Sequence, residues 1–453
     1  MRAAVPLALF LAAVEAHHAG PARGEAFRDP AVLASRDGVL ALTLTAARAT
    51  VDVASRPVLA AVYNGSYAPP TLRVHRGDVV RVRLVNALED ETNLHAHGLS
   101  VSPVGSSDDV FLHVPPGGAQ GYEIRIPSSH APGLYWYHPH PHGHSDDQVR
   151  NGMSGALIVE GLLDPFPELR DVTEHVFLLK DAQIGGGHIV HRAIGDDAIR
   201  TVNGMLNPTI TLRPGETELW RIGNIGADLY YVLTLDGHRF YEVARDGYRL
   251  ARLVPQQQLF LPPGAREEVL VQAAGPGSYA LRTAGFNTGP QGNQYPGAVL
   301  ATMRVAGAAI TPMALPKQLL PVADLRGAVT GRRTIVFSET ADGDTLFIDG
   351  RTFDPTRTDT RVKLGAVEEW TIRNESDELH DFHIHQTHFQ VTDVNGVPQP
   401  FVGYQDIVNV PVRGAVKVVI PFTDPVIVGR FVYHCHLLAH EDKGMMATIE
   451  VTP

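Results

Sequence analysis

The sequence contains only one cysteine, Cys435, in 453 residues, so no intramolecular disulfide can stabilise the chain. It also lacks any apolar run near the ~20 residues that a membrane-spanning helix needs. Acidic residues outnumber basic ones, 49 to 38, and the net charge of −11 argues against nucleic acid or an anionic membrane as a partner. Charged residues make up only 19% of the chain and hydrophobic residues 44%, which excludes a disordered protein and indicates folded domains with sizeable cores.

Residues 1–16 are predicted to be a cleavable secretory signal peptide. Arg2 supplies a positive charge, an apolar run extends from Ala3 to Val14, and the small residue Ala16 precedes a polar stretch. A buried first strand or a short anchor is the alternative. The paired arginines that mark export in the folded state are absent. We therefore expect export, to a periplasm or outside the cell, and a mature chain that is not stably inserted in a membrane.

Two short sequence elements each occur three times and predict the domain organisation. The first runs from a glycine to an asparagine nine residues later, and the second begins with a glycine and alternates aromatic or apolar residues. The first occupies 77–86, 215–224 and 365–374, and the second occupies 133–138, 277–282 and 429–434. Both have the period of a half-buried strand. We predict an all-β chain of three tandem two-sheet sandwiches, at about 25–163, 164–307 and 320–453.

Histidine pairs recur at equivalent places in the first and third repeats only. Nine residues after the asparagine, these repeats carry His95-Ala96-His97 and His383-Ile384-His385, where the second carries Leu233-Thr234-Leu235. In the other element they carry His138-Pro139-His140 and His434-Cys435-His436, where the second carries Arg282-Thr283-Ala284. Eight histidines in matching positions predict a metal site at an interface between the first and third domains. The second domain is then predicted to be a spacer that lets the other two meet.

Cys435 is the centre of a second predicted metal site. A thiolate, two imidazoles and a weak axial thioether form the copper site of blue copper proteins, and His440 and Met445 follow Cys435 at intervals of five residues. His380 stands where the other two repeats have no histidine, so one such site is expected, in the third domain. On a strand, Cys435 would point to one face and its two neighbours to the other. The stretch would then connect two metal centres covalently, and metal would occupy a free thiol that is unusual in an exported protein.

These motifs resemble those of the multicopper oxidases: His95-Ala96-His97-Gly98, His138-Pro139-His140, His380 to His385, and Tyr433 to Met446. The resemblance covers nearly the whole mature chain, and every expected ligand position is filled. It implies cupredoxin-like Greek-key sandwiches and four copper ions: one type 1, one type 2 and a coupled type 3 pair. The implied type 1 ligands are His380, Cys435, His440 and Met445, and the implied type 2 ligands are His95 and His383. The implied type 3 ligands are His97, His138, His140, His385, His434 and His436.

The resemblance also implies acidic residues that supply protons. Glu441 directly follows His440, where laccase-like members have an acid near the oxygen path. Asp108 or Asp109 resembles the acid near type 2 copper, and the slightly long spacing from His95 leaves the choice between them open. For all three, a solvated or turn carboxylate is the alternative. The roles of four other histidines stay open: His142, His144, His188 and His191.

Reducing dioxygen to water takes four electrons, which four copper ions can collect from donors that give one at a time. We expect a laccase-like oxidase that takes electrons from small phenolic or aryl-amine donors, with metal ions as a further class, and passes them to dioxygen. The seven methionines are scattered, which disfavours a dedicated cuprous oxidase because soft thioethers suit Cu(I). Two polar loops rich in glycine and proline, 287–296 and 341–358, either flank the donor pocket or are ordinary surface turns.

The rival hypothesis is a non-enzymatic copper-binding or copper-tolerance protein of the envelope. Family members of that kind have lost ligands, whereas this sequence has kept them all. A copper nitrite reductase is a weaker enzyme alternative, since those chains have two domains and lack the His-Cys-His bridge to a coupled pair. The identity of the donor and the oligomeric state stay open.

Overall fold

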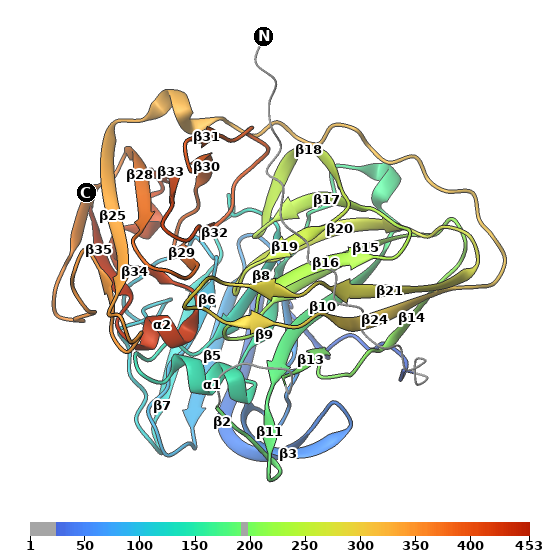
Figure 1. Ribbon diagram of the computed structural model, residues 1–453, viewed down its shortest axis with the longest axis horizontal. Coiled ribbons are helices and arrows are strands. Elements are labelled where there is room, and N and C mark those ends of the chain that lie inside the picture. Colours follow the sequence, from blue (N-terminus) through green and yellow to red (C-terminus); the bar gives the residue numbers. More distant parts are fainter. Residues whose placement is uncertain (1–23, 192–197) are drawn as a thin grey trace.

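The computed structural model describes residues 24–191 and 198–453, and within them six large β-sheets form three sandwiches (Figure 1). Each sandwich packs a six-stranded sheet against a five-stranded one. The predicted signal peptide, residues 1–16, lies outside the described residues. Among the helices of the described ranges, none has the length and apolar character to cross a bilayer. The predicted all-β, three-sandwich fold is confirmed.

The first sandwich contains the earliest strands of the chain. Its six-stranded sheet has the order β11 (Ile184–Gly185), β12 (His188–Ile189), β3 (Arg56–Tyr63), β2 (Val39–Val53), β5 (Val79–Asn86) and β7 (Ala119–Arg125). Its five-stranded sheet has the order β1 (Val32–Ala34), β4 (Thr71–Val74), β9 (Gly155–Val159), β8 (Gly133–His138) and β6 (His95–His97).

The second sandwich repeats this plan. One sheet has the order β13 (Ile199–Val202), β10 (Thr173–Ala182), β15 (Thr217–Asn224), β20 (Arg266–Gln272), β17 (Phe240–Arg245) and β18 (Tyr248–Gln256). The other has the order β14 (Thr209–Leu212), β24 (Ala298–Val305), β21 (Gly277–Thr283), β16 (Tyr231–Leu235) and β19 (Leu259–Leu261). A separate hairpin joins β22 (Phe286–Asn287) to β23 (Gln294–Tyr295).

The third sandwich follows the same order of strands. One sheet runs β26 (Leu346–Ile348), β25 (Gly331–Glu339), β28 (Ala366–Asn374), β33 (Ala415–Phe422), β30 (Gln390–Val394) and β31 (Val397–Pro398). The other runs β27 (Thr360–Lys363), β35 (Met446–Thr452), β34 (Gly429–Cys435), β29 (His380–Ile384) and β32 (Ile407–Val410). The short helices are α1 (Ser145–Asn151), α2 (Leu438–Asp442), η1 (Pro167–Leu169), η2 (Leu325–Ala328) and η3 (Pro425–Ile427).

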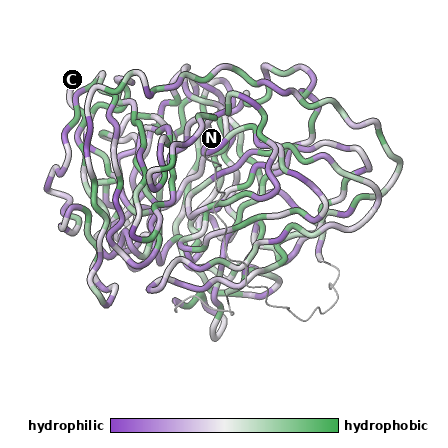
Figure 2. Tube along the Cα trace, turned by 45° about the horizontal axis from the view of Figure 1, so that its top comes forward, coloured by the Kyte–Doolittle hydropathy of each residue, from purple (hydrophilic) through white to green (hydrophobic). Residues whose placement is uncertain are grey.

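The two repeated sequence elements form equivalent strands in all three sandwiches. The first element forms β5, β15 and β28, and the second forms β8, β21 and β34. In β5, Val80, Val82 and Leu84 are buried while the intervening arginines face outward, as the two-residue period of a strand requires. The same alternation of green and purple runs along many strands in Figure 2. The pattern of apolar residues therefore determines which face of each sheet enters its core.

The register between these strands is the same in the first and third domains, and this is what places the histidines. In the first domain His95 lies opposite His138, and in the third His383 lies opposite His434. In the second domain the pairing is shifted by one residue: Leu233 lies opposite Thr283, and Arg282, which takes the place of His138 and His434 in the repeat, lies opposite Thr234. The shared register of the outer repeats thus brings two imidazoles together in each.

Two segments cross the predicted domain boundaries. The hairpin β11–β12 lies in the range predicted for the second domain, yet His188 pairs with Leu59 and extends the first domain's sheet. Near the start of the described chain, Ala26 bridges to Thr209 of the second domain. The boundaries near residues 25 and 163 remain predictions, and the first two sandwiches exchange short pieces of chain across them.

Candidate metal centres

The eight paired histidines of the first and third domains meet in one buried cluster. They lie at the ends of β6, β8, β29 and β34 or just beyond, and none exposes more than 3% of its surface. Strand β8 is buried on both faces: Tyr135 and Tyr137 enter the first domain's core, while Trp136 packs toward the second domain. The Trp136 ring stacks on that of His138 at 4.1 Å, which fixes one wall of the cluster.

Ring nitrogens in this cluster face each other at spacings that suit a shared metal ion. His97 Nδ1 lies 3.1 Å from His436 Nε2, and His434 Nε2 lies 3.3 Å from His140 Nε2 and 3.1 Å from His385 Nε2. Two nitrogens bound at about 2.0–2.1 Å to one tetrahedral metal ion lie about 3.3 Å apart. The Nε2 atoms of His95, His138 and His383 are buried without a hydrogen-bond partner, and a metal ion would supply one.

The imidazoles are in the protonation state that metal ions bind. Burial, and in most cases the neighbouring histidines, lower the pKa of each of the eight well below its ordinary value. At neutral pH each ring is then uncharged and offers a lone pair. Triads with donor atoms close enough to hold one ion include His95–His97–His138, His95–His383–His385 and His140–His385–His434.

Nitrogens that point away from the cluster are held by oxygen atoms, which fixes the rings. The contacts are His95 Nδ1 to Asp108 at 3.0 Å, His138 Nδ1 to the Pro139 carbonyl at 2.9 Å, His383 Nδ1 to the Asp406 carbonyl at 2.8 Å, and His434 Nδ1 to the Cys435 carbonyl at 3.0 Å. With Nδ1 as the donor, Nε2 of each of these four rings keeps its lone pair for the cluster.

The two candidate aspartates take different positions. The buried Asp108 carboxylate contacts His95 and accepts hydrogen bonds from the Ala96 amide at 2.8 Å and from Gln386 Nε2 at 3.0 Å. Burial raises the pKa of Asp108 to about 8. Asp109 instead accepts a hydrogen bond from the Phe111 amide in a turn. Asp108 is therefore the aspartate that meets the histidine cluster.

Glu441 lies against the other side of the cluster. Its carboxylate is 3.1 Å from His434 Nδ1 and 3.4 Å from His140 Nδ1, and it is fully buried. Burial, reinforced by the neighbouring Asp442, raises the pKa of Glu441 well above its ordinary value. The Glu441 carboxyl, which lies beside two of the predicted type 3 ligands, therefore loses its proton less readily than an exposed carboxyl.

Cys435 has the second set of ligands on its own face of the strand. Its Sγ lies 3.6 Å from His380 Nδ1 and 3.7 Å from His440 Nδ1, and these two nitrogens are 3.1 Å apart. The three form a further triad close enough for one ion. On either side of Cys435 in the chain, His434 and His436 belong to the eight-histidine cluster. The strand therefore presents one thiol to one cluster of nitrogens and two imidazoles to the other.

Met445 and Met446 are separated by the same alternation. Met446 pairs with His434, whereas the Met445 carbonyl accepts a hydrogen bond from the Cys435 amide at 3.1 Å. Met445 is fully buried in the same apolar cluster as Cys435, and Met446 belongs to a different one. Met445, the predicted axial ligand, is therefore the methionine whose backbone contacts Cys435.

The outer edge of the Cys435 site is acidic. His440 Nε2 lies 3.1 Å from a carboxylate oxygen of Glu378, and both side chains are only slightly exposed. Burial and the nearby Glu378 raise the pKa of Glu339, next to this pair, to about 7. Both polar loops noted in the sequence approach this edge: the Thr288 carbonyl accepts from the Leu379 amide at 2.6 Å, and the Gly343 carbonyl from Lys443 Nζ at 3.1 Å.

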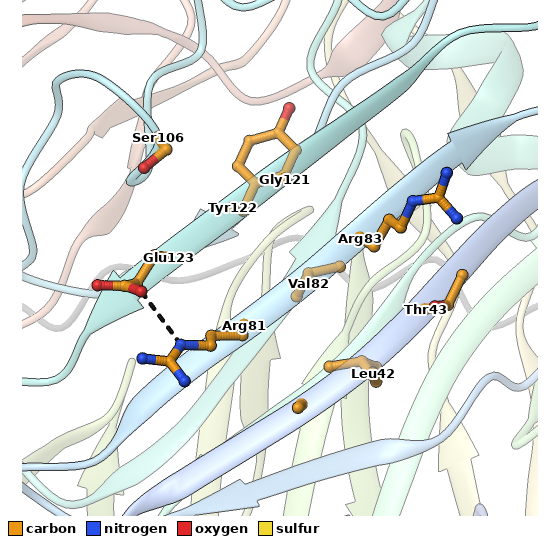
Figure 3. A pocket seen from close by; sticks show the side chains of 10 residues that line it. Leu42, Thr43, Arg81, Val82, Arg83, Ser106, Gly121, Tyr122 and Glu123 are labelled. Atoms are coloured by element: carbon orange, nitrogen blue, oxygen red, sulfur yellow. Dashed lines mark hydrogen bonds and ion pairs between the residues drawn. The ribbon is translucent and has the colours of Figure 1, made fainter.

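Two concavities differ in their relation to the metal cluster. One, of about 220 Å³, reaches the cluster at His140 and is lined also by His142, Phe111, Phe353 and Met446. The other, of about 670 Å³, lies on the outer face of β2, β5 and β7 (Figure 3). The Arg81–Glu123 ion pair, 3.1 Å long, crosses that face, and no histidine, cysteine or methionine lines it. Of these two cavities, only the smaller is lined by histidine and methionine side chains.

The remaining histidines with open roles lie outside both centres. His144 precedes α1, His188 lies in β12, and His191 Nε2 is 3.3 Å from an Asp146 carboxylate oxygen. Sequence reasoning missed Asp406 and Glu378, which contact predicted ligands. The position of Glu378 two residues before His380 was a usable signal, whereas nothing in the sequence near Asp406 indicated its role.

The donor set suits copper. Neutral imidazoles and a cysteine with a buried methionine beside it are the ligands of blue copper sites, and the buried, unpartnered nitrogens of the cluster have no other means of satisfaction among the described residues. Three models of the multicopper oxidase family match residues 45–163, 179–308 and 328–453. The chain belongs to the multicopper oxidase family. Membership implies copper binding.

Similar proteins carry more than one kind of name. The chain is 27% identical over 410 residues to the multicopper oxidase mco of Staphylococcus haemolyticus, covering 86% of this chain and 83% of that one. It is also 27% identical to the cell division protein FtsP of Escherichia coli, covering 86% and 85%. Among solved structures, a multicopper oxidase from Campylobacter jejuni described as a metallo-oxidase matches with a TM-score of 0.83, 26% identity and coverage of 95% and 96%. A laccase from Pediococcus acidilactici matches with a TM-score of 0.83 and 26% identity, covering 96% of this chain and 95% of that one.

Proposed function

We propose that this protein is a laccase-like oxidase that couples four one-electron oxidations of a small donor to the reduction of dioxygen to two waters. The observation that carries the proposal is the arrangement of β34. Cys435 faces His380 and His440, while His434 and His436 face the cluster shared with the first domain. A short run of covalent bonds thereby joins the site that we propose accepts single electrons to the site that we propose reduces dioxygen.

The residues would hold four copper ions as follows. His380, Cys435, His440 and Met445 would hold the type 1 ion, and His95 and His383 the type 2 ion. His97, His138 and His436 would hold one type 3 ion, and His140, His385 and His434 the other. Bound copper would supply one-electron redox chemistry and Lewis acidity at the oxygen site. The neutral, oriented imidazoles preorganise both sites before any ion binds.

Protons and dioxygen need their own routes. The Glu441 carboxyl lies next to His140 and His434, and the Asp108 carboxyl lies next to His95. Both are placed to donate protons as oxygen is reduced. The cavity at His140, with apolar walls from Phe111, Phe353 and Met446, is the access route that we propose for dioxygen. A Phe353→Trp substitution that fills it should raise the KM for dioxygen and leave the KM for the donor unchanged.

Electrons would enter at the His440 edge. Carboxylates of Glu378 and Glu339 lie there, so aryl amines and metal ions, which carry or develop positive charge, are supported as donors together with phenols. The metallo-oxidase described for the Campylobacter jejuni relative and the laccase from Pediococcus acidilactici are consistent with both donor classes.

Purified, copper-loaded protein tests the proposal. We expect about four copper ions per chain, a blue absorption, and consumption of dioxygen with a phenol or aryl amine that yields water without free peroxide. Other relatives at the same identity are named for cell division and not for oxidation, so we keep a second candidate, a copper-binding protein without oxidase activity. Copper binding without oxygen uptake across a donor panel would establish that candidate and reject the oxidase.

Export remains part of the proposal. The cysteine would be occupied by copper in an oxidising compartment, where an unoccupied thiol is unusual. Recovery of the protein from the envelope or medium fraction, with a first residue near position 17, is the expected result, and a cytoplasmic chain with an intact start would contradict it.

A further inference from the structure

Arg266 is a buried arginine of the second domain whose guanidinium group lies at the meeting point of all three sandwiches. It is fully buried at the start of β20. An arginine side chain has five N–H donors, and here each has an acceptor. Nε donates to the Leu134 carbonyl at 3.2 Å. Nη1 donates to the Gly264 carbonyl at 3.1 Å and to Asp406 Oδ1 at 2.7 Å, and Nη2 donates to the Asp246 carbonyl at 2.8 Å and to Asp406 Oδ2 at 2.7 Å. A fully satisfied group of this kind has one allowed position.

The guanidinium group also packs directly against the turn that follows His97. Gly98 has a φ of +84°, and a Cβ there would lie 2.4 Å from Arg266 Nη2 and 2.7 Å from Asp406 Oδ2. A side chain at this position would therefore displace the ion pair. Arg266 thus touches the first domain through the His97 turn and Leu134, and the third domain through Asp406.

Asp246, also in the second domain, forms hydrogen bonds with the same segment of the third domain, at residues 406 and 407. Its Oδ1 accepts a hydrogen bond from the Arg266 amide at 2.8 Å. Its Oδ2 accepts from the amides of Asp406 and Ile407 at 3.1 and 3.2 Å. The second domain therefore holds residue 406 by its side chain and by its backbone.

Asp406, held in this way, contacts two predicted copper ligands from different domains. Its carbonyl oxygen accepts the hydrogen bond from His383 Nδ1 at 2.8 Å, and its Oδ1 lies 3.4 Å from His97 Nε2. The two imidazoles stack on each other with ring centres 4.0 Å apart. A proton on His383 Nδ1 leaves Nε2 of that ring free to bind metal. His97 Nε2 makes no hydrogen bond, but the carboxylate beside it favours a proton on that nitrogen and leaves Nδ1, which faces His436, free to bind metal.

Asp406 is also close enough to His97 and His383 to be considered as a metal ligand itself. Both of its carboxylate oxygens, however, accept hydrogen bonds from Arg266 at 2.7 Å. Binding a cation with either oxygen would break one of the two bonds and bring the cation toward a buried guanidinium. The geometry favours an orienting group over a ligand.

We propose that Arg266 and Asp246 of the second domain are positioning residues that, through Asp406, set the tautomer and orientation of His97 and His383. The second domain, predicted to be a spacer, then takes part in building a metal centre to which it gives no ligand. This inference rests on the copper centre proposed above.

Arg266→Lys tests the inference because it keeps the charge and removes the two-pronged contact with Asp406. We expect copper affinity at the eight-histidine cluster, or turnover, to fall about 10- to 100-fold, and the electron paramagnetic resonance spectrum of the type 2 copper to change. The blue absorption of the Cys435 site should stay. In copper-free protein, nitrogen NMR should show loss of the single protonation pattern of His383.

Arg221→Lys is the matched control. Arg221 is a buried arginine of the neighbouring strand β15, ion-paired with Glu174 at 2.8 Å and with Glu268, and neither glutamate touches a predicted ligand. The Arg221→Lys variant should lose about as much stability as Arg266→Lys, while its type 2 spectrum and copper content stay those of the wild type. Identical spectra and copper content for Arg266→Lys, Arg221→Lys and the wild type would overturn the inference.

Two further measurements keep the outcomes separate. If Arg266→Lys lacks the blue absorption and is misfolded, Asp246→Asn decides, because Asp246 contacts no histidine among the described residues and its loss should still change the type 2 spectrum. An unchanged spectrum in folded Asp246→Asn would overturn the inference. A wild-type protein that binds no copper would instead reject the proposed function, and the histidine NMR of copper-free protein would still test the positioning role.

Discussion

The two candidate centres differ in how many domains they need. The predicted ligands of the Cys435 site all come from the third sandwich: from β29, β34, α2 and the turn before β35. The eight-histidine cluster draws four histidines from the first sandwich and four from the third, and Asp406, which lies beside two of them, is held by the second sandwich. The predicted ligands of the first site therefore belong to one domain, whereas the eight-histidine cluster requires domains to dock. Perturbations of docking should therefore separate the two.

The largest expected effect comes from Cys435→Ser, which removes the link between the centres. The blue absorption and turnover should both be abolished, because serine cannot supply the thiolate of a blue copper site. Copper at the eight-histidine cluster should remain, since no ligand of that cluster changes. Copper analysis, visible absorption and oxygen uptake on the same sample measure all three, and persistent turnover would refute the electron path through residue 435.

A substitution at Asp442 should weaken the eight-histidine cluster and leave the Cys435 site intact. Its carboxylate, at the end of α2, accepts hydrogen bonds from the amides of Gly143 and Asp146 at 2.8 Å and of Ser145 at 3.3 Å, so it fixes the start of α1 and the loop after His140. Asp442→Asn places a donor against these amides. Copper affinity of the eight-histidine cluster should fall about 10- to 100-fold while the blue site is retained.

Asp324→Asn is the control for this prediction. Asp324 caps η2 in the same way, and its bonds to Arg326 and Gln390 lie within the third domain. It should leave both centres intact. Loss of the blue absorption in Asp442→Asn, or equal copper content in the two variants, would contradict a docking role.

Glu378→Gln should affect the single-domain site alone, and more weakly. The substitution removes a negative charge beside His440 at a partly exposed edge, so KM for a cationic aryl amine should rise about two- to fivefold. KM for a neutral phenol should change less. The exposed Glu375→Gln variant serves as the control, and equal changes for cationic and neutral donors would argue against charge recognition at this edge.

The smallest effect is expected at His175, which lies outside both centres. Although burial lowers the pKa of His175, contacts with Asp29, 2.7 Å from Nδ1, and with Glu218 raise it overall. Because the pKa of His175 is higher in the folded state, the protonated ring stabilises the fold. This stabilisation is complete below the unfolded-state pKa near 6.5 and is lost as pH rises through the folded-state pKa. His175→Gln should therefore cost under about 1 kcal/mol at pH 5.5 and almost nothing at pH 9.

Urea unfolding at the two pH values measures this difference. Copper content and both spectra should match the wild type. A stability loss in His175→Gln that is the same at both pH values would show that packing, and not the ionised histidine, accounts for the effect.

The fold, and the gathering of the paired histidines, could be predicted from the sequence because both follow a repeat. Glycine-to-asparagine spacing and two-residue alternation identified the strands, and the same spacing showed which positions hold histidine in the outer repeats. The choice between Asp108 and Asp109 could not be predicted, because adjacent residues in a turn point in directions that the local sequence does not determine. Asp108 meets His95 only through the path of the chain between them.

Residues that act across domains were beyond the reach of the sequence pattern. Arg266 and Asp406 are 140 positions apart and pair only after three sandwiches assemble. Each looked like an ordinary charged residue at the edge of a strand. The sequence predicts a second domain without ligands, and nothing in its pattern indicated the buried charges to which we assign the orientation of two of them.

The order of the ligands along the chain has a consequence for assembly in time. His140 is the last cluster ligand of the first domain, and His380, the first ligand of the third, follows 240 residues later. At a synthesis rate of about 5–20 residues per second, roughly 12 to 48 seconds separate the two. Only four of the eight cluster histidines have been synthesised during that interval, so copper that arrived then would meet an incomplete set. Supply of the metal after docking, and not during synthesis, is the order of events that this arrangement favours.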